Sequence, residues 1–361
     1  MRLVFLGLSL SSSWGNGHAT TYRALLRALD ARGHEVLFLE REQPWYAAHR
    51  DMPAPNFCTL RFYRSAAELD RHARDLARAD AVIVGSYVPD GAAVIDRIAP
   101  TVRAPFCFYD IDTPVTMRAL TRGDAAYLRP DQVRLFDLYL SFTGGPTLRA
   151  LERDFGARLA RPLYCAVDPE HHRPVPAPRR WDLGYLGTYS PDRQPSLERL
   201  LIEPARRRPD LRFVVAGPLY PSATDWPGNV ARIEHLSPSD HAMFYASQAW
   251  TLNVTRSDMR QRGHSPSVRL FEAGACGTPI ISDPWPGLDT LFLAGHDILI
   301  AHTTRDVLDA LNLSEDRRAA IARAGRARVL ERHTAETRAG ELEAFLSEAR
   351  ARMELIEGAQ A

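Results

Sequence analysis

The sequence contains no lysine, so all 45 of its fixed side-chain cations are arginines. Any phosphate that a side-chain cation binds must therefore be bound by arginine or by a protonated histidine. The arginines are balanced by 44 acidic residues, and the formal net charge is only +1. Because a nucleic-acid-binding protein usually carries a clear basic excess, this balance argues against nucleic acid as the main partner.

The chain also has few cysteines and no long apolar run. Its four cysteines lie far apart and form no Cys-x-x-Cys pair: Cys58, Cys107, Cys165 and Cys276. That spacing argues against a zinc site and a disulfide framework, and it favours a reducing compartment. The apolar stretch at residues 1–10 is too short to cross a bilayer and lacks a small-residue cleavage site before Trp14. We therefore expect a cytoplasmic protein with no transmembrane segment.

Length and composition predict two folded domains. A chain of 361 residues exceeds the usual size of one hydrophobic core, and 45% hydrophobic with 25% charged residues is ordinary for a globular protein. An apolar strand at residues 2–7, a helix at 19–32 with apolar residues at helical spacing, and a strand at 35–39 form a βαβ opening. This pattern is typical of a parallel sheet.

The same alternation continues along the chain. In the first half it predicts strands at residues 81–84, 106–109, 137–142 and 162–165 and helices at 66–78, 91–98 and 146–155. In the second half it predicts strands at residues 182–186, 213–216, 251–254, 279–282 and 298–300, helices at 195–207, 238–247 and 268–276, and a helical end from Arg305 onward. Both halves should therefore be α/β, each with a doubly wound, Rossmann-like sheet.

A proline-rich connector separates the two halves. Residues 168–180 contain four prolines and no hydrophobic period, which is typical of an extended linker. We predict an N-terminal Rossmann-like domain at residues 1–167, a C-terminal Rossmann-like domain at 181–335, and a final helix at 336–361 that packs toward the N-terminal domain. Parallel sheets bind ligands at the carboxyl ends of their strands, so the two domains should face a central cleft.

The strongest motif lies at residues 264–283, His-Ser-Pro-Ser-Val-Arg-Leu-Phe-Glu-Ala-Gly-Ala-Cys-Gly-Thr-Pro-Ile-Ile-Ser-Asp. A polar loop leads into a helix, Glu272 lies one turn inside that helix, and a Gly-Thr-Pro turn leads into a buried strand. Backbone N–H groups at a helix start suit a diphosphate, and a nearby carboxylate suits a ribose diol. Taken alone, Glu272 could be an exposed helix residue and Gly277 a plain helix C-cap.

This arrangement resembles the nucleotide-sugar site of group 1 GT-B glycosyltransferases, and most closely their CgeB/YkvP-like, spore-maturation-protein branch. The matching segments are Arg-Leu-Phe-Glu-Ala at 269–273, Gly-Thr-Pro-Ile-Ile-Ser-Asp at 277–283, Trp-Pro-Gly-Leu-Asp at 285–289, Tyr-Leu-Gly-Thr-Tyr at 185–189 and Leu-Asn-Val-Thr-Arg at 252–256. The resemblance implies a nucleoside-diphosphate-sugar donor as co-substrate, no cofactor and no metal. It also implies a hexosyltransferase-type reaction, with retention, to a small-molecule, glycan or protein acceptor. The N-terminal domain would then be the acceptor side, and the C-terminal domain would bind the nucleotide sugar.

The resemblance also implies residue roles. Glu272 matches the last glutamate of the family's Glu-x7-Glu motif, which binds the donor ribose, whereas the first glutamate falls on His264. Arg193 follows a predicted strand where the group places cations on the donor phosphates, and Arg256 could add charge. The predicted donor-binding residues are Gly15, Gly17, Gly187, Arg193, Arg256, His264, Ser265, Ser267, Arg269 and Glu272. The alternatives are solvated surface arginines and, for Arg269, an internal salt bridge with Glu272.

The first strand-to-helix loop contains Gly15, Gly17 and His18. The two glycines would let backbone approach a pyrophosphate, but Thr20 stands where a dinucleotide fingerprint needs glycine, which disfavours NAD. At a helix start the positive end of the dipole keeps His18 neutral near pH 7, so it could accept a proton from an acceptor hydroxyl. A histidine that merely caps the helix is the alternative.

Asp110 and Asp112 end another strand of this half, and their spacing could suit a divalent metal. Because metal-binding Asp-x-Asp pairs belong to glycosyltransferases of a different architecture, we interpret these carboxylates as groups that bind sugar hydroxyls or serve as a base. Asp112 could equally be a helix N-cap before Pro114. The predicted catalytic residues are His18 and Asp110, and the predicted acceptor-binding residues are Trp14 and Asp112. With retention the departing phosphate can take the acceptor proton; with inversion His18 or Asp110 must act as the base.

Two other functions stay open at this point. A nucleotide-sugar epimerase would use the same architecture without a separate acceptor, and a non-catalytic GT-B module would bind a partner or glycan without turnover. His264, in place of the motif's first glutamate, is the feature that leaves room for the second alternative. The fold cannot decide among the three, because function resides in the site.

Overall fold

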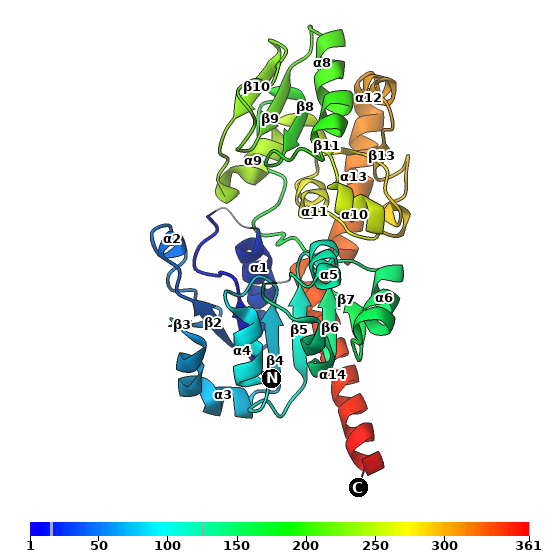
Figure 1. Cartoon of the computed structure of the whole chain (residues 1–361). Coiled ribbons are helices and arrows are strands. Elements are labelled where there is room, and N and C mark those ends of the chain that lie inside the picture. Colours follow the sequence, from blue (N-terminus) through cyan, green and yellow to red (C-terminus); the bar gives the residue numbers. More distant parts are fainter. Residues whose placement is uncertain (15–16, 125, 361) are drawn as a thin grey trace. The chain divides into compact units, whose positions relative to one another are not determined.

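The computed structural model describes residues 1–14, 17–124 and 126–360. It divides into two compact units. Unit 1 consists of Met1–Ala166 together with the chain from Ala335 onward, and unit 2 consists of Val167–Thr334. Each unit contains a parallel β-sheet with helices packed on it (Figure 1).

The sheet of unit 1 has the strand order β3-β2-β1-β4-β5-β6-β7. Its strands are β1 (Arg2–Gly7), β2 (Glu35–Arg41), β3 (Thr59–Tyr63), β4 (Ala81–Gly85), β5 (Phe106–Asp110), β6 (Leu138–Ser141) and β7 (Ala160–Pro162). Val4 and Leu6 of β1 pack on one face of the sheet, and Leu3 and Phe5 pack on the other. Both faces are thus buried, which explains the continuous apolar run of this strand.

Helices cover both faces of this sheet. They are α1 (His18–Ala31), α2 (Pro44–Ala47), α3 (Ala73–Arg78), α4 (Gly91–Ile98), α5 (Thr113–Arg122), α6 (Pro146–Phe155) and α14 (Ala335–Gln360), with 3₁₀ turns at Ala66–His72 and Pro130–Leu135. Helix α14 packs beside α1 through a stripe of buried residues spaced three and four apart: Ala339, Leu342, Leu346 and Ala349. Glu343 of α14 also pairs with Arg32 at 2.7 Å. The last helix is therefore part of the core of unit 1.

Unit 2 repeats this architecture with the strand order β10-β9-β8-β11-β12-β13. Its strands are β8 (Trp181–Leu186), β9 (Phe213–Ala216), β10 (Val230–Ile233), β11 (Gln248–Asn253), β12 (Ile280–Ser282) and β13 (Leu299–Ile300). Its helices are α7 (Gln194–Leu197), α8 (Glu203–Arg207), α9 (His241–Ala246), α10 (Ser257–Arg262), α11 (Val268–Ala275), α12 (Thr304–Leu311) and α13 (Glu315–Arg332). A π-helical segment at Glu198–Ile202 joins α7 to α8. The strand order reverses between β8 and β11, and ligands are expected at the carboxyl ends of such strands.

Each unit has the doubly wound α/β architecture that the sequence predicts, so that prediction is confirmed. The elements that it did not predict are α2, β3, α5, β10 and α10. Strands β3 and β10 lie at sheet edges and are only partly buried, so they lack the apolar run that identifies an interior strand. No helix in the described part of the chain is long and apolar enough to cross a membrane.

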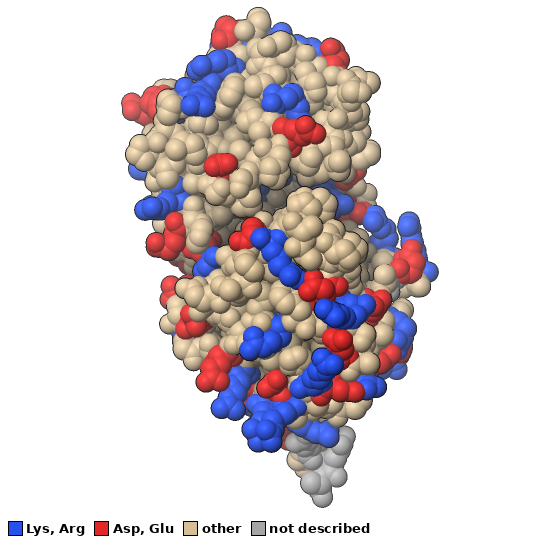
Figure 2. Space-filling view, turned by 90° about the vertical axis from the view of Figure 1, so that its left-hand side faces the viewer, with Lys and Arg blue, Asp and Glu red and all other residues tan. Residues whose placement is uncertain are grey.

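Charge of both signs is mixed on part of the molecular surface. On the face that Figure 2 shows, arginine and acidic side chains are interleaved over unit 1. Ion pairs of this unit include Arg41 with Asp90 at 2.7 Å and Arg50 with Glu42 at 2.5 Å. This mixed pattern differs from the basic patch of a single sign by which nucleic-acid-binding proteins are recognised.

Candidate functional site

Arg269 lies at the carboxyl end of the unit 2 sheet and is buried at the start of α11. Its guanidinium donates to the Leu186 carbonyl, to Asn253 Oδ1 at 2.8 Å and to Ser267 Oγ at 3.4 Å. These acceptors are neutral, so none of these bonds cancels the positive charge. The guanidinium does not form the salt bridge with Glu272 that the sequence spacing allowed. The structure thus brings two predicted donor residues, Arg269 and Ser267, into contact.

Two further predicted arginines, Arg193 and Arg256, belong to the same unit. Burial lowers the pKa of Arg193, and the charges of Arg269 and Arg256 lower it further, because nearby like charges disfavour the protonated form. Arg193 donates to the Thr188 carbonyl at 2.5 Å, which is again a neutral acceptor. An anion bound beside Arg193 would relieve this repulsion. The arrangement therefore suits a phosphate or a diphosphate.

Asp192 holds the loop that carries Arg193, a role that the sequence analysis missed. Its carboxylate accepts a hydrogen bond from the Ser257 N–H at 2.7 Å and another from the Ser190 hydroxyl. Burial would raise the pKa of Asp192, but these hydrogen bonds and the charge of Arg256 lower it to about 2. The loop after β8 is thereby tied to the first residue of α10.

Gly187 lies where two strand-end loops pack directly on each other. A Cβ at Gly217, which has φ of +139°, would come within 2.2 Å of the Gly187 carbonyl oxygen. A Cβ at Gly187 itself would lie 2.5 Å from the Tyr185 hydroxyl and 3.0 Å from Arg269 Nη2. Glycine at these positions lets the backbone after β8 approach Arg269 closely.

The loop before α11 places the other predicted residues of the motif. His264 has φ of 48°, and its N–H donates to the Pro286 carbonyl at 2.6 Å. Its ring lies against Gly287, where a Cβ would be 2.3 Å from Nδ1. Ser265 is buried, and Ser267 occupies the N-cap position of α11. His264 therefore packs against the neighbouring turn, while the serines lead to the helix start.

Glu272 is buried one turn inside α11, among two histidines and a tyrosine. Its Oε2 accepts a hydrogen bond from the Tyr245 hydroxyl at 3.1 Å and lies 3.5 Å from His241 Nδ1, and its Oε1 lies 3.6 Å from His172 Nε2. Burial would raise the pKa of Glu272, but His172, His241 and Tyr245 lower it to about 2. Glu272 is therefore not an exposed helix residue, and a ribose bound here would share its carboxylate with these groups.

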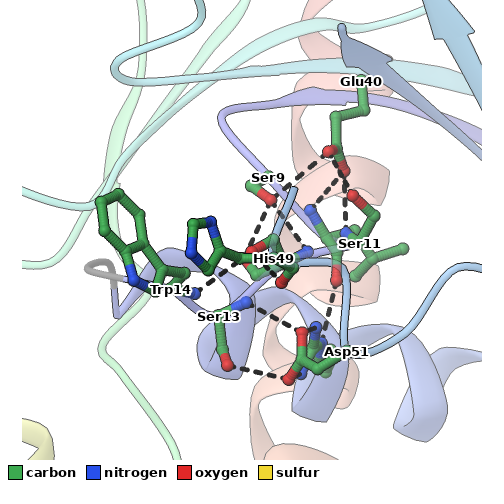
Figure 3. Close-up of polar contacts among 10 residues, drawn as sticks. Ser9, Ser11, Ser13, Trp14, Glu40, His49 and Asp51 are labelled. Carbon is green, nitrogen blue, oxygen red and sulfur yellow. Dashed lines mark hydrogen bonds and ion pairs between the residues drawn. The ribbon is translucent and has the colours of Figure 1, made fainter. Parts of the chain in front are cut away.

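In unit 1, the loop after β1 is held by a buried glutamate. Glu40 on β2 accepts hydrogen bonds from the Leu10 N–H at 2.6 Å and the Ser11 N–H at 2.9 Å (Figure 3). Asp51 accepts one from the Ser13 N–H at 3.0 Å, further along the same loop. These bonds fix the backbone that leads to the predicted acceptor residues.

Trp14 follows this loop and stacks on His49. Their ring centroids are 4.6 Å apart with an interplanar angle of 15° (Figure 3), and Trp14 is 51% exposed. An amphipathic ring of this kind presents a large apolar surface next to water, where it can pack against a sugar ring. The Trp14 side chain is thus available for its predicted role at the carboxyl end of β1.

His18 is the first residue of α1, with Gly17 in the cap position before it. Gly15, which we also predicted as a donor residue, lies outside the described residues. Burial lowers the pKa of His18 to about 4, so the ring is neutral at pH 7, although the sequence analysis attributed the neutral ring to the helix dipole. Its Nδ1 is buried and has no hydrogen-bond partner among the described residues. That nitrogen could bond to a substrate hydroxyl.

Acidification is expected to destabilise the wild type more than the His18→Asn variant. Below pH 6.5 the unfolded state binds a proton at His18, whereas the folded state does not do so until about pH 4. The free energy of unfolding should therefore decrease as the pH is lowered from 6.5 to about 4, by up to about 3 kcal/mol. Urea titrations of both proteins between pH 7.5 and 4 test this, and parallel pH profiles would contradict it.

Asp110 is fully buried at the end of β5. Its carboxylate accepts hydrogen bonds from the Tyr139 hydroxyl at 2.6 Å and the Thr116 hydroxyl at 2.7 Å. Burial raises the pKa of Asp110 to about 6, although these bonds oppose the rise. Because both oxygens are enclosed and already accept hydrogen bonds, the structure does not support the predicted catalytic role. It favours Asp110 as a group that holds β5 against β6 and α5.

Asp112 lies two residues further on, immediately before α5. It occupies the N-cap position, but its side chain makes no capping hydrogen bond. Its Oδ2 instead accepts a hydrogen bond from the Tyr87 hydroxyl at 3.3 Å. The side chain is half-buried, so Asp112 is better placed than Asp110 to meet a substrate.

The sequence analysis missed several residues of unit 2 that contact the predicted ones: His172, Asp192, His241, Tyr245 and Asn253. Asn253 lies within a segment that carried the family resemblance, and its position at the end of a strand is a signal that could have identified it. The histidines come from the connector and from α9, and only the fold brings them to Glu272.

Two doubly wound units define the GT-B fold class of glycosyltransferases, and solved structures agree. Sucrose-phosphate synthase from Thermosynechococcus elongatus has a TM-score of 0.70 at 14% identity, over 98% of this chain and 100% of that chain. Anabaena Alr3699/HepE in complex with UDP and glucose has a TM-score of 0.67 at 14% identity, over 96% and 100%. An α-glucosyltransferase in complex with UDP has a TM-score of 0.69 at 12% identity, over 96% and 100%. The chain therefore has the GT-B fold.

The sequence of the C-terminal part also matches a protein family. Residues 193–344 match the family described as Glycosyl transferase-like. The matched segment begins at Arg193 and includes Arg256, Arg269 and Glu272. No curated protein matches the chain. The C-terminal part is thus glycosyl transferase-like in sequence as well as in fold.

Proposed function

We propose that this chain is a glycosyltransferase that moves a sugar from a nucleoside-diphosphate-sugar donor to an acceptor. The proposal depends chiefly on Arg193, Arg256 and Arg269 at the carboxyl end of the unit 2 sheet. Arg193 and Arg269 donate to neutral oxygens, and the charges of Arg269 and Arg256 both disfavour the protonated form of Arg193. A diphosphate is the kind of anion that such a set binds. The GT-B fold and the family match support the same reaction class.

In this scheme each donor residue has a distinct task. The arginines and the N-terminal N–H groups of α11 stabilise the charge that develops on the leaving diphosphate. Glu272 binds the ribose hydroxyls. Since the arginines supply the positive charge, the transfer step uses no metal and no resident cofactor. A hexosyl donor and the CgeB/YkvP-like branch are parts of the proposal that depend on the sequence resemblance.

The acceptor side of the proposal uses unit 1. Trp14 packs against the acceptor, and Asp112 and His18 bind its hydroxyl groups; the acceptor is a small molecule, a glycan or a protein. With retention, which the resemblance favours, the departing phosphate takes the acceptor proton. With inversion, His18 is the base, because the oxygens of Asp110 are enclosed.

Release of free nucleoside diphosphate tests the reaction. UDP-glucose is the first donor to assay, since an Anabaena HepE structure holds that compound. We expect release that depends on an added acceptor and that falls roughly 100-fold in Arg193→Ala. The matched control is Arg305→Ala, whose side chain is 85% exposed on α12 and which should match the wild type. Full activity in Arg193→Ala would contradict the proposal.

The same assay separates the alternatives. An epimerase would convert the donor without an acceptor and without releasing free nucleoside diphosphate. A non-catalytic module would bind donor or glycan and release nothing, with every donor and acceptor tried.

A further inference from the structure

Three side chains of metal-ligating types meet in unit 2, from segments far apart in the sequence. His172 comes from the connector before β8, His241 is the first residue of α9, and Glu272 lies in α11. His172 Nε2 lies 3.6 Å from Glu272 Oε1, and His241 Nδ1 lies 3.5 Å from Glu272 Oε2. One ligand atom from each residue lies within 4.8 Å of the other two.

The imidazole of His172 has no hydrogen-bond partner among the described residues. The residue is 7% exposed, and both of its ring nitrogens are buried without a bond. His241 Nδ1 is also buried without a hydrogen-bond partner among the described residues, because its 3.5 Å contact with Glu272 is too long for a normal hydrogen bond. Burying unpaired ring nitrogens is unfavourable. A cation bound between these ring nitrogens would be coordinated by them.

The spacing of these atoms fits a small cation. Zinc holds nitrogen and oxygen ligands at about 2.0–2.2 Å in a tetrahedron, which places neighbouring ligand atoms roughly 3.3–3.6 Å apart. The two nitrogen–oxygen separations, 3.6 Å to Glu272 Oε1 and 3.5 Å to Glu272 Oε2, lie near this range but involve different carboxylate oxygens, and one ligand atom from each residue lies within 4.8 Å of the others. Two imidazoles with one carboxylate suit zinc and related transition metals. The Tyr245 hydroxyl, bonded to Glu272 Oε2 at 3.1 Å, holds the carboxylate in place.

We propose that His172, His241 and Glu272 bind one divalent transition-metal ion, with zinc as the first candidate. The ion ties the connector to α9 and α11, and its remaining coordination position accepts water or a ligand oxygen. The sequence analysis predicted no metal, because it considered the cysteines and the Asp-x-Asp pair and not these separated histidines. This site goes beyond the proposed transfer reaction, with which it shares Glu272.

Metal analysis of the full chain tests the proposal. After chelator treatment and reloading with zinc, the wild type should retain about one zinc ion per chain. In His172→Asn and His241→Asn, the zinc affinity should fall by more than the roughly 10- to 100-fold that loss of a second-shell contact causes. His171→Asn is the matched control, because that neighbouring histidine is 58% exposed and pairs with Asp168, and it should keep the zinc. No saturable zinc binding by the wild type, or full retention by both variants, overturns the proposal.

X-ray absorption at the zinc edge of the wild type gives a second test that needs no substitution. We expect a nitrogen and oxygen shell with imidazole scattering; a shell of water oxygens alone overturns the proposal. The two proposals can fail separately. Arg193→Ala should lose nucleotide binding and keep the zinc, so a chain that binds no nucleotide still gives a decisive answer about the metal.

Discussion

Arg269→Lys is expected to weaken UDP binding strongly, although the substitution keeps the positive charge. The planar guanidinium group of Arg269 donates to the Leu186 carbonyl, to Asn253 Oδ1 and to Ser267 Oγ at the same time. A lysine ammonium cannot reproduce that planar geometry, so the charge would move away from the diphosphate. Disrupting one partner of a buried, charged contact costs about 2–5 kcal/mol, which is roughly 30-fold or more in affinity.

Calorimetric titration of UDP into the wild type, Arg269→Lys and Arg305→Ala measures this effect. The exposed Arg305 variant should bind like the wild type. We also expect Arg269→Lys to unfold at lower urea concentration, because Asn253 and Leu186 lose their buried donor. Equal UDP affinity in all three proteins would show that Arg269 is only a structural residue.

Asp110→Asn is expected to retain turnover while changing how stability depends on pH. The folded-state pKa of Asp110 is raised from 3.8 to about 6, so its favourable contribution is complete below pH 3.8 and is lost as the pH rises through about 6. The loss amounts to about 3 kcal/mol. Asparagine has no such titration and keeps an acceptor for the Tyr139 hydroxyl. The variant should therefore gain stability relative to the wild type between pH 4 and pH 7.

Urea titrations at pH 4.5 and 7.5, together with the transfer assay at pH 7.5, test this prediction. Asp75→Asn is the control, because its side chain is 54% exposed in the same unit. A folded Asp110→Asn protein with turnover lost by several orders of magnitude would restore the role of base that the sequence analysis assigned. A stability difference that does not change with pH would contradict the raised pKa.

The fold of the interior was predictable because its physical signals are local. The apolar runs of β1, β4 and β5 identify strands that are buried on both faces, and the spacing in α1 identifies a helix. The edge strands β3 and β10 carry no such run. Helix α5 was missed even though Pro114 stands in its first turn, because the sequence analysis interpreted Asp112-Thr-Pro only as a possible cap. The periodicity of apolar residues identifies buried elements. It does not identify β3, β10 or α5, which have other distinguishing features.

The candidate site was predictable only where a motif carried it. Arg269, Glu272 and Ser267 belong to one continuous segment, and in the structure the charges of Arg269 and Arg256 both act on Arg193. The enclosure of Asp110 could not be read from its neighbours, because Tyr139 and Thr116 reach it from β6 and α5. His172 and His241 are equally invisible, since only the packing of the connector and α9 brings them to Glu272.

The most direct test of the central claim is a crystal structure of the full chain with UDP bound. We expect the diphosphate within hydrogen-bond distance of Arg193 and Arg269, near the first turn of α11. Ordered UDP elsewhere in the molecule, for example beside Gly17 and His18 in unit 1, with these arginines unchanged, would contradict the account.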